Sequence, residues 1–317
     1  MTTFIIRRLL QGLIVVLIIT ILVFFAIRYL PGDPLLTYIS GSQFQALNPE
    51  QVEALRHEFG LDKPVIVQYG IWLADVLHGD LGTSIFYRES VSKLLDVRLP
   101  ITLHLGLTAF ILSSILGVAA GTISALRRGK WIDTVITFVA NIGICIPAFW
   151  LAILLIYLFS YRLEWLPIGG YTSPFTDFWL SIKQFILPVF CLSIFGLAGG
   201  ARQSRSSVLE VISQDYIRTA WSKGLSERMI TIRHILKNSL IAVVVFQGLG
   251  FAYIIGGSVF IESVFSINGI GRLAASSVGK QDYAVIQAIV LLTSVMVTLT
   301  NLLVDISLAW LDPRIRY

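Results

Sequence analysis

The chain has 317 residues, of which 56% are hydrophobic and only 14% are charged. A water-soluble domain could not hide that much apolar surface, so the composition predicts an integral membrane protein. The formal net charge is +5, and many of the basic residues lie beside long apolar runs. This placement indicates membrane orientation and gives no support for nucleic-acid binding.

Six apolar stretches are long enough to cross about 30 Å of hydrocarbon as helices. They lie at about residues 9–28, 101–125, 132–159, 184–201, 239–262 and 285–309. The first follows Arg7 and Arg8, as in a signal peptide. Its apolar core is too long for one and no small-residue cleavage site follows, so we expect it to be retained as a span. The sequence therefore predicts an all-α membrane protein with six transmembrane helices.

Lys and Arg are distributed unequally between the two sides of these spans. One side carries Arg7, Arg8, Arg127, Arg128, Lys130, Arg205, Arg218, Lys223, Arg228, Arg233, Lys237, Arg314 and Arg316. The short loops on the other side carry only Arg162, Lys183, Arg272 and Lys280. Because cytoplasmic loops are enriched in Lys and Arg, both termini are expected in the cytoplasm.

The segment at 31–100 is predicted to lie outside the cytoplasm and to fold, and its length exempts it from the charge rule. A first helix is expected to begin after the cap Asn48 and to stop at Gly60. A second helix is expected to begin at Pro64 and to end near 78–79.

No metal, disulfide or catalytic arrangement is expected from the sequence. His57 and His78 lack ligand partners at metal spacing, so they are interpreted as solvated surface residues. Cys145 and Cys191 both fall inside apolar runs and are interpreted as small core residues.

The basic loop at about 204–238 joins the fourth and fifth spans. Apolar residues recur at helical spacing on both sides of a glycine: Leu209, Ile212, Tyr216 and Ala220, then Met229, Ile232 and Leu236. Gly224 interrupts the pattern where the chain must turn, and Ser226 can cap a following helix with Glu227 in its first turn. Two helices joined in this way would form a knob that another protein can hold. The alternative is an ordinary basic loop that only fixes topology.

A few polar residues and prolines lie inside or near the end of the predicted spans. Asn141 and Gln247 are costly in lipid, so each is expected to make hydrogen bonds between helices or to line a pathway. Glu262 is near a span end and is expected at the interface. Pro147 and Pro188 are expected to kink their helices.

The sequence resembles the inner-membrane permease subunits of binding-protein-dependent ABC importers of the oligopeptide/dipeptide/nickel type. The similarity covers nearly the whole chain. Its motifs lie at residues 6–9, 30–34, 61–64, 79–84, 98–103, 215–224, 256–262, 269–273, 282–287 and 312–314. The resemblance implies a type I importer permease (MetI-like) fold. Its parts would be an N-terminal helix over 1–30, an extracytoplasmic region over 31–100, a five-helix core over 101–309 and a cytoplasmic tail over 310–317.

In that family the cytoplasmic loop carries a Glu-Ala-Ala pattern whose short helix lies in a groove of the ATP-hydrolysing subunit. The pattern falls on Arg218, Thr219 and Ala220, and its glycine is Gly224. The resemblance therefore implies these coupling residues: Asp215, Arg218, Thr219, Ala220, Gly224, Ser226, Glu227 and Arg228. Trp221, Lys237 and Asn268 depart from the usual pattern.

The resemblance also implies a set of partners. They are a second homologous permease, two ATP-binding cassette subunits, an extracytoplasmic substrate-binding protein and the lipid of a bacterial or archaeal cytoplasmic membrane. The chain has no GxxxxGK[ST] phosphate-binding loop, so ATP and Mg²⁺ are expected on the partner ATPases and no cofactor on this chain. We expect a permease for short peptides that is not itself an enzyme. The alternatives are a secondary active transporter, or a permease of the same family that imports oligosaccharides or nickel chelates.

Overall fold

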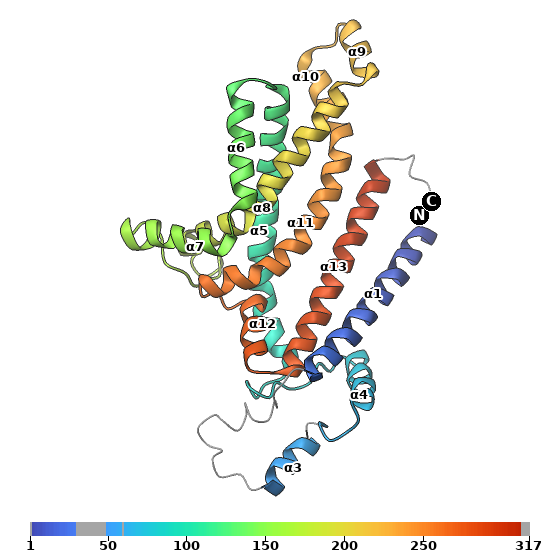
Figure 1. The fold of residues 1–317 in the computed structure, drawn as a ribbon, viewed down its shortest axis with the longest axis vertical. Coiled ribbons are helices and arrows are strands. Elements are labelled where there is room, and N and C mark those ends of the chain that lie inside the picture. The colour runs from blue at the N-terminus through green and yellow to red at the C-terminus, as the bar shows by residue number, and fades with distance from the viewer. Residues whose placement is uncertain (1, 30–48, 59, 312–317) are drawn as a thin grey trace. The chain divides into compact units, whose positions relative to one another are not determined.

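The structure, a computed structural model, describes residues 2–29, 49–58 and 60–311 (Figure 1). The expected cap Asn48 and the motifs at 30–34 and 312–314 lie outside these ranges. Every named element within them is a helix, which confirms the all-α prediction. The chain divides into two compact units. Unit 1 is Met1–Ile101 with Asn268–Thr298, and unit 2 is Thr102–Ile267 with Leu299–Tyr317.

Unit 1 combines the N-terminal part of the chain with a stretch close to the C-terminus. It contains α1 (Thr2–Tyr29), α3 (Pro49–Glu58), α4 (Val65–Leu77), the beginning of α5 (Val91–Leu126), α12 (Ile270–Gly279) and the first half of α13 (Tyr283–Leu311). Its core forms where α5, α12 and α13 meet, from Val91, Leu94, Leu95, Ile270, Leu273, Val285, Ala288 and Ile289. The helices α3 and α4 confirm the two helices expected between the first spans, whereas α12 was not expected.

Unit 2 contains the rest of α5 and α13 together with the middle of the chain. Its other elements are α6 (Trp131–Cys145), α7 (Ala148–Leu155), the π-helix η1 (Ile156–Arg162), α8 (Phe178–Ile212), α9 (Asp215–Ser222), α10 (Glu227–Met229), the π-helix η2 (Ile230–Leu236) and α11 (Lys237–Val264). The helices α6, α7 and α11 all pack against α8. α5 also approaches α8, because a Cβ on Gly121 would lie 2.3 Å from the carbonyl oxygen of Ala201. Small residues permit such close helix contacts.

The third predicted span differs from the expectation of one kinked helix over 132–159. Five described helices are long and apolar enough to cross a membrane, and α6 with α7–η1 form a sixth candidate that is bent by 102°. Ile146 is extended, with φ −74° and ψ 123°, because a residue before proline is disfavoured in the α conformation. The prediction of a kink at Pro147 was therefore too weak: the helix breaks. The 15 residues of α6 rise only about 22 Å, which is short of the hydrocarbon thickness.

Two helices continue through prolines that lie inside them. α5 begins at Val91, before the predicted span start at 101, and includes Pro100. α8 contains Pro188, so this proline does not end its helix as Pro147 does.

The sequence did not foresee the burial of one carboxyl group, and its prediction for one of the two cysteines was wrong. Glu262 is fully buried, and Thr102 Oγ1 donates a hydrogen bond of 2.7 Å to its Oε1. Cys145 is exposed on this chain, whereas Cys191 is buried as expected. His57 and His78 are exposed, which confirms their interpretation as surface residues.

Candidate functional site

The loop between α8 and α11 folds as two short helical segments joined by a glycine turn. α9 ends at Ser222, and Gly224 follows with φ +73°, a conformation that glycine adopts without steric cost. Ser226 then caps α10, because its side chain accepts a hydrogen bond of 3.4 Å from the backbone N–H of Met229. Glu227 lies in the first turn of α10, as expected. The predicted turn and cap are both confirmed.

A buried apolar cluster fixes this loop to the ends of the long helices. Its residues are Ala125 of α5, Val208 of α8, Ile217 and Ala220 of α9, and Ile230 and Ile235 of η2. Ile217 and Ile230 are among the largest fully buried side chains of the described residues. The cluster makes α9 a rigid part of unit 2, at the end where α8 finishes and α11 begins (Figure 1).

The apolar stripe that the sequence predicted through this loop is only partly in register. Ala220 is buried as predicted, and Leu209 and Ile212 pack against the cluster. Ile217, rather than Tyr216, is buried in α9, and Ile230 and Ile235, rather than Met229 and Ile232, are buried in η2. The helix breaks between α8 and α9, which resets the phase of the apolar positions. In η2 the backbone follows the i→i+5 pattern of a π-helix, so two buried residues lie five positions apart.

The outward side of this loop combines charge with large apolar side chains. We call it the loop face: Asp215, Tyr216, Arg218, Thr219, Trp221, Gly224, Ser226, Glu227, Arg228, Met229 and Ile232, all exposed. Tyr216 and Trp221 are each 44% exposed and Ile232 is 56% exposed. Arg218 and Asp215 approach to 3.7 Å, but both are open to solvent, so their ion pair contributes little to stability. Exposed aromatic residues next to charges are typical of a contact surface for another protein.

The structure brings together seven of the eight predicted coupling residues on the loop face. Ala220 is the exception, since it is buried in the cluster beneath α9. The sequence did not identify four surface residues of the loop face. It assigned Tyr216, Met229 and Ile232 to the apolar stripe, and it treated Trp221 as a departure from the family pattern. Their signal was the pairing of large apolar residues with adjacent charges in a loop that is otherwise polar.

A buried carboxylate ties α6 to α5 and α8 near the loop. Asp133 Oδ1 accepts hydrogen bonds from Arg205 Nε at 2.7 Å and Ser124 Oγ at 2.6 Å. Its Oδ2 accepts from Arg205 Nη2 at 2.9 Å and from the backbone N–H of Gly129 at 3.0 Å. We call this arrangement the Asp133 clamp. A bidentate arginine–carboxylate pair with further donors is a strong and directional arrangement, and the sequence analysis did not identify it.

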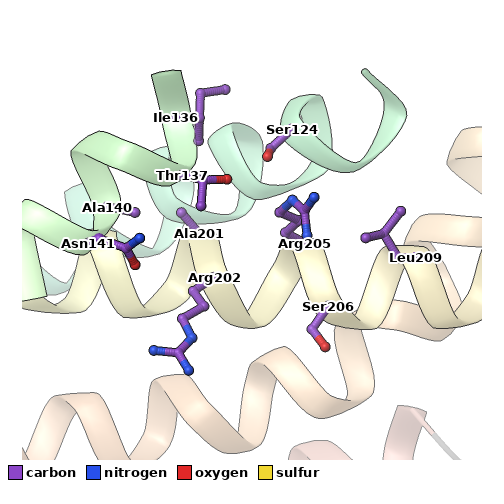
Figure 2. Close-up of a pocket in the computed structure, with 10 residues that line it drawn as sticks. All are labelled: Ser124, Ile136, Thr137, Ala140, Asn141, Ala201, Arg202, Arg205, Ser206 and Leu209. Carbon is purple, nitrogen blue, oxygen red and sulfur yellow. The ribbon is translucent and has the colours of Figure 1, made fainter. Parts of the chain in front are cut away.

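A pocket of about 330 Å³ lies beside the Asp133 clamp, between α5, α6 and α8. Figure 2 shows Ser124 and Arg205 on one side of it and Arg202 turned away from them. Asn141 lines this pocket and is exposed. Gln247 lies elsewhere in unit 2, on a more apolar groove of about 480 Å³ with Ser114 and Phe251. The structure therefore does not bring Asn141 and Gln247 into one site.

Charged and apolar side chains, rather than a cluster of metal ligands, distinguish the loop face among the described residues. No group of three or more His, Cys, Asp or Glu residues that could hold a metal ion is found among them. What the arrangement provides is a capped, anchored knob with an apolar and charged outer side. Its buried base connects the loop face to α8 and η2.

Comparison with known families covers nearly the whole chain. The family model described as binding-protein-dependent transport system inner membrane component matches residues 117–317, and the model for the N-terminal part of such membrane components matches residues 1–106. A putative peptide transport system permease protein of Brucella abortus is 42% identical over 100% of both chains. The oligopeptide transport system permease protein AppB of Bacillus subtilis is 40% identical, again over 100% of both.

Solved structures show the same fold at low sequence identity. A chain from the inward facing MetNI methionine ABC transporter superposes with a TM-score of 0.57 and 17% identity. The match covers 70% of this chain and 97% of the other. It confirms the MetI-like fold that the sequence predicted.

Proposed function

The chain belongs to the binding-protein-dependent transport system inner membrane component family, and from this premise we propose that it forms half of the translocation pathway of an ATP-driven importer for short peptides. Peptides are proposed as the cargo because the relatives in Brucella abortus and Bacillus subtilis are named as peptide and oligopeptide permeases. Oligosaccharides and nickel chelates are the alternative cargoes, since selectivity in such systems belongs largely to a separate binding protein.

The observation that carries this proposal is the loop face on its buried base. Trp221 and Ile232 are large, apolar and about half exposed, while Ile217 and Ile230 beneath them are fully buried. A partner that covers Trp221 and Ile232 would therefore contact a surface that is held in place by buried side chains. We propose that this partner is an ATP-binding cassette subunit and that the loop face docks in a groove of it. The sequence itself contains no phosphate-binding loop, which supports a separate source of energy.

The proposed assembly contains this chain, a second homologous permease, two ATP-binding cassette subunits and an extracytoplasmic substrate-binding protein. ATP and Mg²⁺ would bind to the cassette subunits, and this chain would take no part in the chemistry of hydrolysis. The Lys and Arg distribution supports an orientation in the cytoplasmic membrane with the loop face and both termini inside.

The experiment tests docking at the loop face directly. Trp221→Ser and Ile232→Ser together should weaken co-purification with the cassette subunits, because truncating a central aromatic anchor commonly costs about 2 kcal/mol or more. That cost is roughly thirtyfold in affinity. Phe175→Ser is the matched control, since Phe175 is 98% exposed in another segment of unit 2. We expect the control to leave the complex intact.

Unchanged cassette binding and unchanged transport in the double variant would reject the loop face as the docking surface. A second result would reject the proposed class of transporter. Cargo uptake by this chain alone in liposomes, driven by an ion gradient without cassette subunits, would identify a secondary active transporter instead.

A further inference from the structure

A second pocket lies in unit 1, where α4 packs against the end of α1, and its volume is about 680 Å³. Its charged lining residues include Arg28, Lys63 and Arg88, opposed by the carboxylate of Asp75. Trp72 and Gln287 also line it. We call it the α1–α4 pocket, and nothing in the coupling mechanism uses it.

Two buried hydrogen-bond donors at this pocket have no partner among the described residues: Trp72 Nε1 and Gln287 Nε2. Gln287 is only 4% exposed. A buried donor without a partner costs about 1–3 kcal/mol, so such groups call for an explanation. The terminal torsion of glutamine is soft, which lets its amide turn toward a ligand in the pocket. The two donors would be satisfied by a ligand that carries hydrogen-bond acceptors.

Arg28 is held in place at the pocket by unit 1 itself. Its Nε donates a 2.7 Å hydrogen bond to Gln68 Oε1, and its guanidinium carbon lies 3.4 Å from the ring centre of Phe24. Gln68 is oriented in turn, because its Nε2 donates to the backbone carbonyl of Lys63 at 2.8 Å. Since guanidinium carries five N–H donors, it can still donate to an anion. Fixed donors and an excess of positive charge favour a phosphate or carboxylate.

The surroundings of the pocket place it at the level of a lipid headgroup. Arg28 lies in the last turn of α1, whose residues Ile5–Tyr29 form an apolar span. Tyr69 and Trp72 of α4 pack around Phe24 at centroid distances of 5.1 and 6.0 Å. Clusters of Tyr and Trp at the end of a span are typical of the membrane interface.

The helix α4 has the character of an interfacial helix. It has no buried residue, and it exposes Ile66 at 76% and Leu77 at 80%. With 13 residues it is too short to span the hydrocarbon, and an apolar segment of this length that is not buried in a core is typical of one that lies at the interface. An acidic protein partner would neutralise the cations but leave this apolar face in water. A phospholipid covers both, with its phosphate in the pocket and its acyl chains against α4.

We propose that the α1–α4 pocket binds the headgroup of an anionic phospholipid, with Arg28, Lys63, Trp72 and Gln287 as donors to its phosphate oxygens. The inference does not depend on the proposed coupling to ATPases. It would hold equally if the loop face had another role.

The test uses two variants that change no charge: Gln287→Leu and Trp72→Phe. The full chain is placed in nanodiscs of phosphatidylcholine with and without phosphatidylglycerol, and thermal unfolding and lipid retention by native mass spectrometry are measured. Each variant should lower phosphatidylglycerol retention roughly tenfold, since a hydrogen bond to a charged group has that order of effect. Each should also lose most of the thermal stabilisation that this lipid gives. Trp179→Phe, at a tryptophan 72% exposed in unit 2, should retain both.

The opposite outcomes are equally clear. If the pocket holds no lipid, Gln287→Leu removes an unsatisfied donor and should raise the unfolding temperature equally in both membranes, which would overturn the proposal. Inorganic phosphate that stabilises the protein in pure phosphatidylcholine as well as the lipid does would assign the pocket to a free anion. If the variants changed only the affinity for a substrate-binding protein, the pocket would be a protein contact.

Discussion

Replacing Gly224 tests how much the loop face depends on the turn beneath it. Gly224 has φ +73°, and a Cβ built on it meets no atom within 4 Å. Steric collision with neighbours therefore contributes nothing to the effect of a substitution. The backbone conformation alone decides it, which makes this position a clean test of the turn.

The free-energy cost of each substitution at Gly224 depends on how readily the new residue adopts the left-handed backbone conformation. Alanine should cost about 1 kcal/mol relative to glycine and valine up to about 3 kcal/mol. Asparagine visits this region more readily than other non-glycine residues, so it should cost least. If the strain is relieved by displacing α10, docking of a partner on the loop face should weaken in the order asparagine, alanine, valine. A cost of about 2–3 kcal/mol corresponds to a loss of roughly thirtyfold or more in affinity.

The assay compares ATP hydrolysis with substrate uptake in proteoliposomes that contain the complete importer. Gly224→Val should lower uptake for each ATP hydrolysed, or lower cassette binding, while membrane insertion and binding of the second permease stay normal. Gly224→Asn is the matched control, because it keeps the turn. Equal coupling in the valine and asparagine variants would refute the reasoning, since only the backbone preference distinguishes them here.

Three further predictions concern the clamp, the helix packing and the topology. Asp133→Asn should lower the free energy of unfolding by about 2 kcal/mol, measured by thermal denaturation of the full chain. This is less than the 3–5 kcal/mol typical of a broken buried ion pair, because the arginine partner is one-third exposed. An unchanged unfolding transition would contradict the prediction. Gly121→Ala should lower the free energy of unfolding by about 1–3 kcal/mol, because the added methyl group forces α5 away from α8. Gly106→Ala is the control and should be nearly neutral, since a Cβ there would have its nearest contact at 3.4 Å. Equal effects of the two substitutions would disprove the close approach of α5 and α8. Cysteines introduced at Gln51 and Ser226 should react with impermeant reagents from opposite faces of the membrane, and reaction from one face would overturn the predicted orientation.

Local signals in the sequence were enough for much of the fold and for the turn in the loop. Apolar length predicted the long helices, and proline and glycine predicted the ends of α3 and α4. Gly224 and Ser226 were identified as turn and cap because their chemistry acts within a few residues. The same reasoning could not foresee the complete break at Pro147, since proline inside an apolar run predicts a kink as readily as a break. Pro188, in the same sequence, leaves its helix continuous.

Contacts between residues that are far apart in the chain could not be predicted from the sequence. Asp133 is paired with an arginine 72 positions away, and nothing local indicates that partner. Glu262 was expected near the membrane interface because of its place in the chain, and nothing local indicated that it is buried with a hydrogen bond from Thr102 of α5. Part of the register of the apolar stripe in the loop was mistaken for a related reason. Periodicity assumes one continuous α-helix, whereas the chain breaks before α9 and changes to a π-helix in η2.

The proline inside α8 affects where this helix can bend and therefore how far the loop face could move. Pro188 cannot donate the backbone hydrogen bond to residue 184 that an unbroken helix would contain, which makes this point the most easily bent in α8. The stretch from Pro188 to Ile212 is about 36 Å long at 1.5 Å per residue. If α8 bent at the proline, this stretch would move as one arm. A tilt of about 10° there would carry the far end, and α9 with it, through about 6 Å, which is close to the pitch of one helical turn.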